Sequence, residues 1–353
     1  MKYTIEKLSK ILIISTIIFV FMFGVTANVR AQGNSCEIVI DAESGRILHS
    51  LNEEEIRPMA SLTKIITCIT VIENYDVTKE IRIRKEWTGV EGSSVYLKED
   101  EVLTVEELLY GLMLRSGNDC AVSLACSLSG SIENFAQKMN ELAFKVGAIN
   151  SSFKNPHGLD CEGHYTTAKD LAFITAYAMK NELFRKIVST KKINIGNGEN
   201  ARTLYNKNKL LTNYEYATGV KTGYTKKAGR CLVSSSSKNE FNLICVVLNC
   251  GPMFERSQEL LNSSYSNYKR IKLLSKDKAV GEIKTKKGNI LPVYVKEDLF
   301  YPLKDNEIKE IEYQLDIDKN GQILEKFNQE SGTIKILLKK QLLFERKIFT
   351  IIG

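Results

Sequence analysis

The chain has 353 residues, enough for about two domains and a substantial core. Its hydrophobic content of 43% and charged content of 26% are ordinary for a globular protein. The net charge of +7 is spread over many lysines rather than gathered in a basic tail, and no nucleic-acid-binding motif is present. We therefore expect no nucleic-acid partner, and the charge suits solubility near an anionic cell surface.

The first 31 residues are typical of a secretory signal peptide and are excluded from the fold. Three lysines within the first ten residues precede an almost continuous apolar run over residues 11–25. Val29-Arg30-Ala31 then offers small side chains for cleavage before Gln32. Since the apolar run is slightly long, an uncleaved membrane anchor is the alternative. Either way we expect an exported, extracytoplasmic protein of the cell envelope.

Eight cysteines in an exported chain invite a disulfide framework. Most of them, however, lie in apolar helix or strand patterns, where a free thiol behaves as a small hydrophobe. No Cys-x-x-Cys pair is present, and the three histidines show no zinc-ligand spacing with the cysteines. We expect mostly free thiols, no structural metal and no cofactor.

Two short β-rich runs over residues 37–41 and 46–49 flank a Ser-Gly turn and predict a hairpin. Pro58 then precedes a helical pattern in which apolar residues recur at spacings of three and four, typical of one buried face. On that helix Ser61 and Lys64 are three residues apart, so the hydroxyl and the amine share a face. A serine beside a lysine that acts as a base is a nucleophile that needs no histidine.

The pattern Ser-x-x-Lys is weak by itself, because it occurs six times in this chain. Only the copy at Ser61 leads into an apolar helix. We take Ser61 as the candidate nucleophile and look for its partners elsewhere in the chain.

Thr104 and Glu107 form the pattern of a capping box, which predicts a helix that continues over residues 108–114. Gly117 is expected to stop it before a second apolar helix over residues 121–128. Ser116 and Asn118 would then lie in a short turn from which side chains can point into a cleft. The alternative is that Ser-Gly-Asn is ordinary turn chemistry.

Further helices are predicted over residues 134–146 and 171–179. His157 and His164 fall in turn-rich sequence between them. Either could be a general base, but structural hydrogen bonding is favoured for both.

Residues 220–225, 231–235 and 241–248 predict a three-strand antiparallel meander, followed by a helix over residues 255–268. Gly223 lies on its first strand, where a glycine marks either a bulge or the close approach of a ligand or another backbone.

Beyond about residue 275, short β-rich runs alternate with polar turns and predict a small all-β domain. We divide the chain into a signal peptide (1–31), a catalytic domain (32–272) and an all-β domain (273–353). The apolar C-terminal residues 348–352 are too rich in β-branched side chains for a membrane-lying helix to be preferred.

Three weak motifs become specific through their order, which follows the signature of penicillin-binding proteins and class A β-lactamases. They are Ser61-x-x-Lys64, Ser116-Gly117-Asn118 and Lys221-Thr222-Gly223. The chain resembles the serine D-alanyl-D-alanine carboxypeptidases, the low-molecular-weight penicillin-binding proteins, over roughly residues 36–270. The resemblance also includes Asn155-Pro156-His157-Gly158-Leu159, His164-Tyr165-Thr166-Thr167-Ala168 and Lys221-Thr222-Gly223-Tyr224-Thr225.

The resemblance implies an α/β (α+β) fold: a penicillin-binding, β-lactamase-like transpeptidase domain with an antiparallel sheet and a helical cluster, plus a small all-β C-terminal domain. It implies removal of the terminal D-alanine from peptidoglycan pentapeptide stems through an acyl-enzyme, with β-lactam antibiotics as inhibitors. Membrane association through the N-terminus or the C-terminal domain stays open.

The resemblance also assigns roles. Ser61 would attack the substrate carbonyl, neutral Lys64 would take its proton, and Ser116 would relay a proton to the leaving amine. Asn118 would bind the substrate's amide, and Lys221 and Thr222 would bind its C-terminal carboxylate. The strand at Gly223 and Tyr224 would also contact the substrate. The N–H groups of Ser61 and Tyr224 would form the oxyanion hole.

Two departures from the family pattern stand out. The middle motif is Ser-Gly-Asn rather than the Ser-Asp-Asn of class A β-lactamases, which favours the carboxypeptidase branch, and Asp100 stands where a glycine is expected. The alternatives are a D,D-endopeptidase or a β-lactamase on the same fold, although no glutamate that activates the deacylating water can be assigned. A non-catalytic envelope-binding protein is the alternative from another class.

Overall fold

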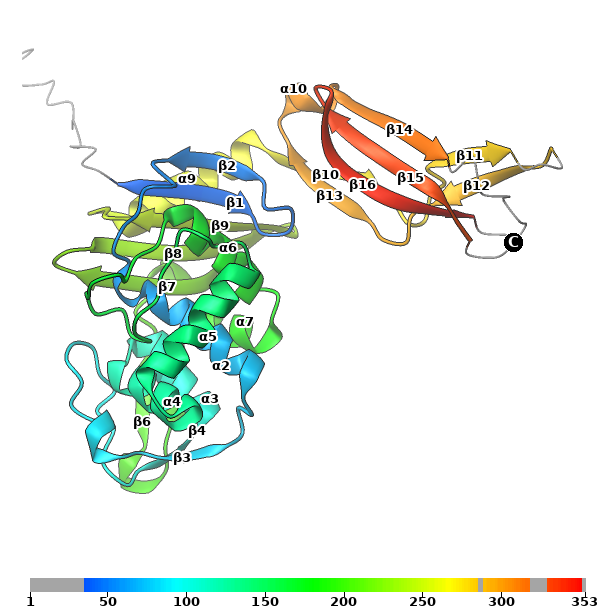
Figure 1. The fold of residues 1–353 in the computed structure, drawn as a ribbon. Coiled ribbons are helices and arrows are strands. Elements are labelled where there is room, and N and C mark those ends of the chain that lie inside the picture. Colours follow the sequence, from blue (N-terminus) through cyan, green and yellow to red (C-terminus); the bar gives the residue numbers. More distant parts are fainter. Residues whose placement is uncertain (1–34, 285–287, 318–328, 351–353) are drawn as a thin grey trace, which may run out of the picture. The chain divides into compact units, whose positions relative to one another are not determined.

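Five strands form an antiparallel sheet in the order β2-β1-β9-β8-β7 (Figure 1). The structure is a computed structural model and describes residues 35–284, 288–317 and 329–350; the predicted signal peptide lies outside these ranges. The predicted hairpin and meander are confirmed. The strands are β1 (Cys36–Asp41), β2 (Ile47–Leu51), β7 (Ala217–Thr225), β8 (Gly229–Lys238) and β9 (Phe241–Leu248).

The two faces of this sheet pack against different helices, because side chains alternate along each strand. On β9, Ile244 and Val246 belong to the larger apolar core, whereas Cys245 and Val247 belong to a second core. Helix α9 (Met253–Asn267) supplies Leu260 and its neighbours to the second core. The strands β1, β8 and β9 are therefore buried on both faces over most of their length, whereas the edge strand β2 is partly exposed.

The larger core is built around α2 (Lys64–Asn74), which follows the 3₁₀ turn η1 (Ala60–Thr63). The sequence pattern predicted one buried face, and this was wrong: every α2 residue from Lys64 to Val71 is buried, including Thr67 and Thr70. Neighbouring helices surround α2, so its polar positions also lie inside the protein (Figure 1). The short helix α8 (Leu210–Asn213) packs on β7. The other helices on the side of the larger core are α3 (Val105–Tyr110), the π-helical turn η3 (Gly111–Arg115), α4 (Asn118–Ser129), α5 (Ile132–Lys145), α6 (Ala168–Ala178) and α7 (Glu182–Ser189).

Small hairpins complete the part of the chain before residue 268. Strands β3 (Glu80–Arg82) and β4 (Val102–Thr104) pair with each other, as do β5 (Lys192–Ile195) and β6 (Arg202–Tyr205). The predicted capping box is present at the start of α3. Asp100, where the resemblance led us to expect glycine, adopts a left-handed φ of 62°, which glycine takes at lowest cost.

In its described residues the C-terminal part consists of strands and the short helix α10 (Asp305–Ile308), which agrees with the predicted all-β domain. Its five-stranded sheet has the order β11-β12-β16-β15-β14, and β10 pairs separately with β13. Their apolar side chains form a core of their own around Val293, Ile334 and Ile348. The domain boundary at residue 273 stays a prediction. The strands are β10 (Lys269–Leu274), β11 (Gly281–Lys284), β12 (Ile290–Tyr294), β13 (Leu299–Leu303), β14 (Ile311–Ile317), β15 (Gln329–Leu338) and β16 (Gln341–Thr350).

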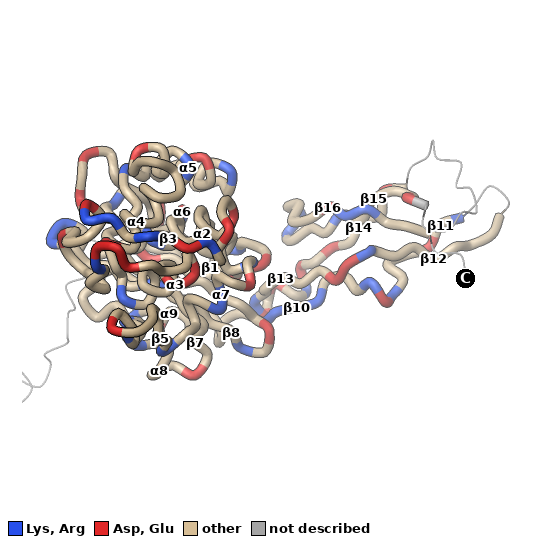
Figure 2. Tube along the Cα trace, turned by 90° about the horizontal axis from the view of Figure 1, so that it is seen from below, with Lys and Arg blue, Asp and Glu red and all other residues tan. Residues whose placement is uncertain are grey.

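Lys and Arg positions alternate with Asp and Glu positions along the described chain (Figure 2). All eight cysteines are free thiols. Within the described ranges, no group of His, Cys, Asp and Glu side chains is arranged to hold a metal ion. In the same part of the chain, every helix is too short or too polar to cross a bilayer.

Candidate active site

The structure brings Ser61 and Lys64 together at the junction of η1 and α2. Lys64 has no exposed surface, and its Nζ lies 3.0 Å from Ser61 Oγ, 2.7 Å from Asn118 Oδ1 and 2.5 Å from the carbonyl oxygen of His157. Three elements that are distant in sequence therefore converge on one amine.

Burial is the main reason that the pKa of Lys64 lies well below its ordinary value, and the charge of Lys221 lowers it further. A buried amine without a carboxylate partner is most stable when neutral. A neutral Lys64 has a free electron pair on Nζ, which lies within hydrogen-bonding distance of the Ser61 hydroxyl. The pair can therefore act as nucleophile and base.

Ser116 lies in the turn between η3 and α4, as predicted, whereas Asn118 is the first residue of α4. The predicted helix stop is confirmed, since η3 ends at Arg115, but the residue with the left-handed φ is Ser116 (65°) and not Gly117 (−60°). Gly117 is needed for space instead: a Cβ there would lie 2.8 Å from Asp119 Oδ1 and 3.1 Å from Cys120 Sγ. A left-handed φ at a serine is uncommon and often occurs at functional sites.

Asn118 is held at both ends of its amide. Its Oδ1 accepts from Lys64, and its Nδ2 donates to the carbonyl oxygen of Glu91 at 2.5 Å. These partners fix the orientation of the amide, because only the oxygen can accept from an amine. Asn118 therefore connects Lys64 to the loop that begins at Glu91.

Strand β7 forms the opposite wall. A Cβ on Gly223 would lie 3.1 Å from the carbonyl oxygen of Met59 and 3.3 Å from the backbone nitrogen of Leu62. Of the two interpretations of Gly223, close approach to another backbone is thus the one observed. Glycine lets β7 pack directly on the turn that carries Ser61.

Lys221 is fully buried, and its Nζ donates to the carbonyl oxygen of Thr222 at 2.9 Å. Burial, with a smaller contribution from the charge of Lys207, lowers the pKa of Lys221 to about 7.

A cavity of about 560 Å³ opens between these walls. Five of the predicted site residues line it: Ser61, Ser116, Thr222, Gly223 and Tyr224. The other three, Lys64, Asn118 and Lys221, are buried and do not line it. The sequence reasoning missed the remaining lining residues, which are Ser93, Lys207, Arg230 and Met253.

Two of the missed residues are exposed cations. Arg230 on β8 pairs in register with Tyr224 on β7, so the hairpin brings it to the cavity. Arg230 could have been found from the sequence by pairing residues across the predicted hairpin turn, which places it opposite Tyr224. Lys207 donates from Nζ to Ser93 Oγ at 3.0 Å, and nothing in its sequence context indicated this.

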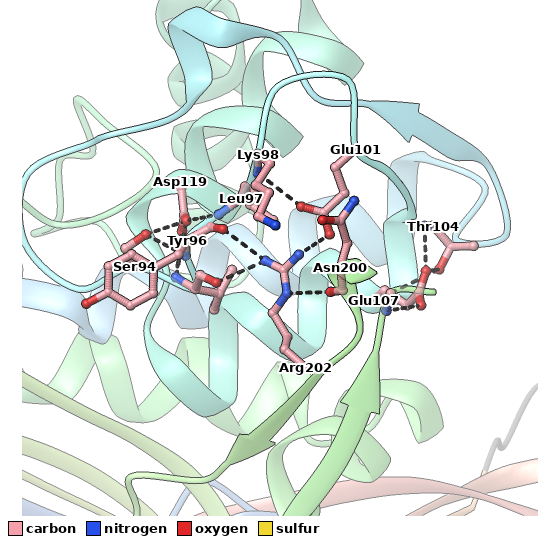
Figure 3. Close-up of polar contacts among 12 residues, drawn as sticks. Ser94, Tyr96, Leu97, Lys98, Glu101, Thr104, Glu107, Asp119, Asn200 and Arg202 are labelled. Atoms are coloured by element: carbon pink, nitrogen blue, oxygen red, sulfur yellow. Dashed lines mark hydrogen bonds and ion pairs between the residues drawn. The ribbon is translucent and has the colours of Figure 1, made fainter. Parts of the chain in front are cut away.

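The loop that carries Ser93 is fixed by a polar cluster (Figure 3). Asp119 accepts from Ser94 Oγ at 2.5 Å and from the backbone N–H groups of Val95 and Leu97. Arg202 reaches the same loop from β6. Asp119, which follows Asn118 in the chain, thus anchors one wall of the cavity.

Of the two histidines beside the site, His164 is buried and His157 is half-buried, and the pKa of each ring lies below its ordinary value. Burial, followed by the charge of Lys64, lowers the pKa of His157 to about 3. Burial also lowers the pKa of His164 to about 4. His157 Nδ1 accepts from the N–H of Leu159 at 3.1 Å.

Comparison with known proteins gives a consistent picture. The family model described as D-alanyl-D-alanine carboxypeptidase matches residues 25–251, and that of the penicillin-binding protein 5 C-terminal domain matches residues 268–351. The D-alanyl-D-alanine carboxypeptidase DacF of Bacillus subtilis (strain 168) is 35% identical over 260 residues, which are 71% of this chain and 67% of that relative.

Solved structures are also similar to this chain, one over 90% of its length and another over 65%. Penicillin binding protein 5 from Haemophilus influenzae has a TM-score of 0.75 and 27% identity, with 90% of this chain and 96% of that one covered. The Streptomyces K15 DD-transpeptidase has a TM-score of 0.61 and 30% identity, with 65% of this chain and 96% of that one covered.

Proposed function

The chain belongs to the family of D-alanyl-D-alanine carboxypeptidases, and from this membership we propose the following reaction. The protein removes the terminal D-alanine from peptidoglycan pentapeptide stems through an acyl-enzyme on Ser61. The observation that carries the proposal is the contact of 3.0 Å between Ser61 Oγ and the buried Lys64 Nζ, beside an open cavity.

In the first step, neutral Lys64 takes the proton of Ser61 as Oγ attacks the penultimate carbonyl carbon. The negative charge that forms on the carbonyl oxygen would be stabilised by the N–H groups of Ser61 and Tyr224. The close packing of β7 on η1 at Gly223 supports this assignment, because it joins the two elements that supply the donors.

The peptide bond then breaks, and the leaving amine of D-alanine needs a proton. Ser116 lines the same cavity as Ser61 and is assigned to pass that proton from Lys64 to the amine. Water afterwards attacks the ester on Ser61 and releases the shortened stem. β-Lactams present an amide carbonyl that resembles the substrate's and is strained by its ring, and they are expected to acylate Ser61.

The terminal carboxylate of the substrate calls for cations and hydroxyl groups at one end of the cavity. Thr222, Lys207 and Arg230 line the cavity and suit this role. We propose that Lys221 acts mainly through its charge on Lys64, since its Nζ is buried and bonded to the Thr222 carbonyl oxygen. Recognition of a free carboxylate favours trimming of chain ends over internal cleavage.

Export to the outer face of the cytoplasmic membrane is also part of the proposal, since the peptidoglycan substrate is extracytoplasmic. Mass spectrometry of the mature N-terminus would show cleavage before Gln32. An intact N-terminus in the membrane fraction would instead support the anchor.

The test compares a pentapeptide that ends in D-Ala-D-Ala with the same peptide carrying a C-terminal amide. We expect D-alanine release from the first and little reaction with the second. Equal cleavage of both, or cleavage only of cross-linked stems, would indicate an endopeptidase. Rapid hydrolysis of penicillin without a lasting adduct would indicate a β-lactamase, and no reaction with any substrate would indicate a binding protein.

A further inference from the structure

The peptide group between Ala60 and Ser61 contains both the Ala60 carbonyl and the Ser61 N–H. Because a peptide group is planar, whatever orients the carbonyl also orients the N–H. Ala60 has φ 50°, in the left-handed region that residues with a Cβ rarely adopt. This orientation therefore depends on contacts that hold the peptide group in place.

Two contacts hold the Ala60 carbonyl oxygen. Thr63, which has no exposed surface, donates from Oγ1 to this oxygen at 2.9 Å. Gly158 packs on it so closely that a Cβ there would lie 2.0 Å away. The loop of His157 and Gly158 therefore restricts the directions in which the carbonyl can point.

His164 completes this arrangement. Its Nε2 lies 2.9 Å from Thr63 Oγ1, and its Nδ1 accepts from the N–H of Lys154 at 3.0 Å. Since the only hydrogen of the Thr63 hydroxyl goes to Ala60, Thr63 Oγ1 accepts from His164, and Nε2 carries the ring proton. The rings of Phe153 and His164 pack edge to face, with their centroids 6.0 Å apart.

The result is a continuous series of donors, from the Lys154 N–H through His164 and Thr63 to the Ala60 carbonyl. Hydrogen bonds in such a series polarise one another and become stronger. Protonation of His164 would break it, because Nδ1 could no longer accept. Burial keeps the pKa of His164 near 4, so the ring stays neutral at working pH.

We propose that His164 is a positioning residue, which acts through Thr63 to orient the Ala60–Ser61 peptide so that the Ser61 N–H faces the substrate's carbonyl oxygen. The inference rests on the proposed function. It adds a role for a histidine that touches neither the substrate nor the reacting atoms.

Two pairs of variants test it. Thr63→Val removes the hydroxyl and Thr63→Ser keeps it. His164→Asn keeps an acceptor near Nδ1 but loses the donor to Thr63, whereas His164→Gln can supply an N–H near Nε2. Each protein is assayed for acylation by a fluorescent penicillin and for kcat and KM of D-alanine release.

We expect Thr63→Val and His164→Asn to lower kcat and the acylation rate about 10- to 100-fold, less than the ~10²–10³-fold loss when an oxyanion donor is removed outright. KM should stay within about threefold, because the contact acts in the transition state. Thr63→Ser and His164→Gln should recover most of the rate.

Thr67→Val is the matched control. Thr67 is buried one turn further along α2, and its Oγ1 donates to the carbonyl oxygen of Pro156 at 2.8 Å, in the same loop. It should lower the melting temperature about as much as Thr63→Val while leaving kcat unchanged.

The inference is overturned if Thr63→Val or His164→Asn folds and keeps the wild-type kcat, if Thr67→Val lowers kcat equally, or if the conservative variants fail to recover the rate. Should Thr63→Val not fold, the His164 pair decides. If the wild-type protein releases no D-alanine and takes up no penicillin, the proposed function itself has failed.

Discussion

Replacement of Arg202 by methionine should destabilise the protein and disturb one wall of the cavity. The Arg202 guanidinium pairs with Glu101, and the two side chains are only 17% and 2% exposed. Arg202 also donates to the carbonyl oxygens of Val95 (3.0 Å) and Tyr96 (3.2 Å), as Figure 3 shows. Arg202→Met would leave the Glu101 carboxylate buried without its cation.

Removing one partner of a buried ion pair costs about 3–5 kcal/mol, because the remaining charge is uncompensated. The matched control is Arg82→Met. Arg82 pairs with Asp100 at 3.6 Å, but the side chains are 67% and 75% exposed, and such pairs contribute about 0–1 kcal/mol. The double variant Glu101→Gln/Arg202→Met should recover part of the loss, since it removes the unpaired charge.

The assay is chemical unfolding, which gives the free energy of unfolding, followed by the rate of penicillin acylation of the folded protein. Because Val95 and Tyr96 continue the loop from Ser93, we also expect slower acylation in Arg202→Met. The reasoning is refuted if Arg202→Met loses less than about 1 kcal/mol, as an exposed pair would, or if the double variant is no more stable than the single one.

Three further predictions concern charge. Lys221→Met removes a cation that lowers the pKa of Lys64, so the acid limb of the acylation profile should move to higher pH. Arg230→Leu should raise KM for the pentapeptide about tenfold, equivalent to about 1.4 kcal/mol, whereas Lys226→Leu, which removes an exposed cation from the turn of the same hairpin, should not. The pKa of His164 is lowered to about 4 in the folded protein, so the unfolded chain binds its proton first as the pH falls. Stability should therefore decrease from about pH 6.5 towards pH 4, and less so in His164→Gln.

Each of these has a contrary outcome. An unchanged acid limb in Lys221→Met would mean that burial alone sets the pKa of Lys64. An equal rise in KM for Lys226→Leu would mean that only the overall charge matters. An identical pH dependence of stability in His164→Gln would show that other groups control the acid transition.

Local patterns predicted much of the fold. The capping box at Thr104 and the strand over residues 241–248 depend on neighbours in the chain, and both were predicted. The environment of α2 could not be predicted, because its threonines would suit a solvent-exposed face in isolation. Thr67 instead donates to the carbonyl oxygen of Pro156, 89 residues away.

The motifs likewise predicted the residues that meet at Ser61, but not the way each is used. Lys221 was expected to bind the substrate carboxylate directly, yet it is buried, whereas Arg230 lines the cavity. His164 was favoured for structural hydrogen bonding, but its partner Thr63 lies 101 residues away and could not be named. Such contacts are set by the packing of whole elements, which the local pattern does not encode.

The most direct test of the central claim is to locate the covalent adduct formed with a penicillin. Wild-type protein and Ser61→Ala are incubated with the antibiotic and analysed as intact proteins and as peptides by mass spectrometry, with D-alanine release measured in parallel. We predict a single stable adduct on Ser61 and D-alanine release from the wild-type protein, with neither in Ser61→Ala. An adduct on another residue, or D-alanine release retained by Ser61→Ala, would contradict the account.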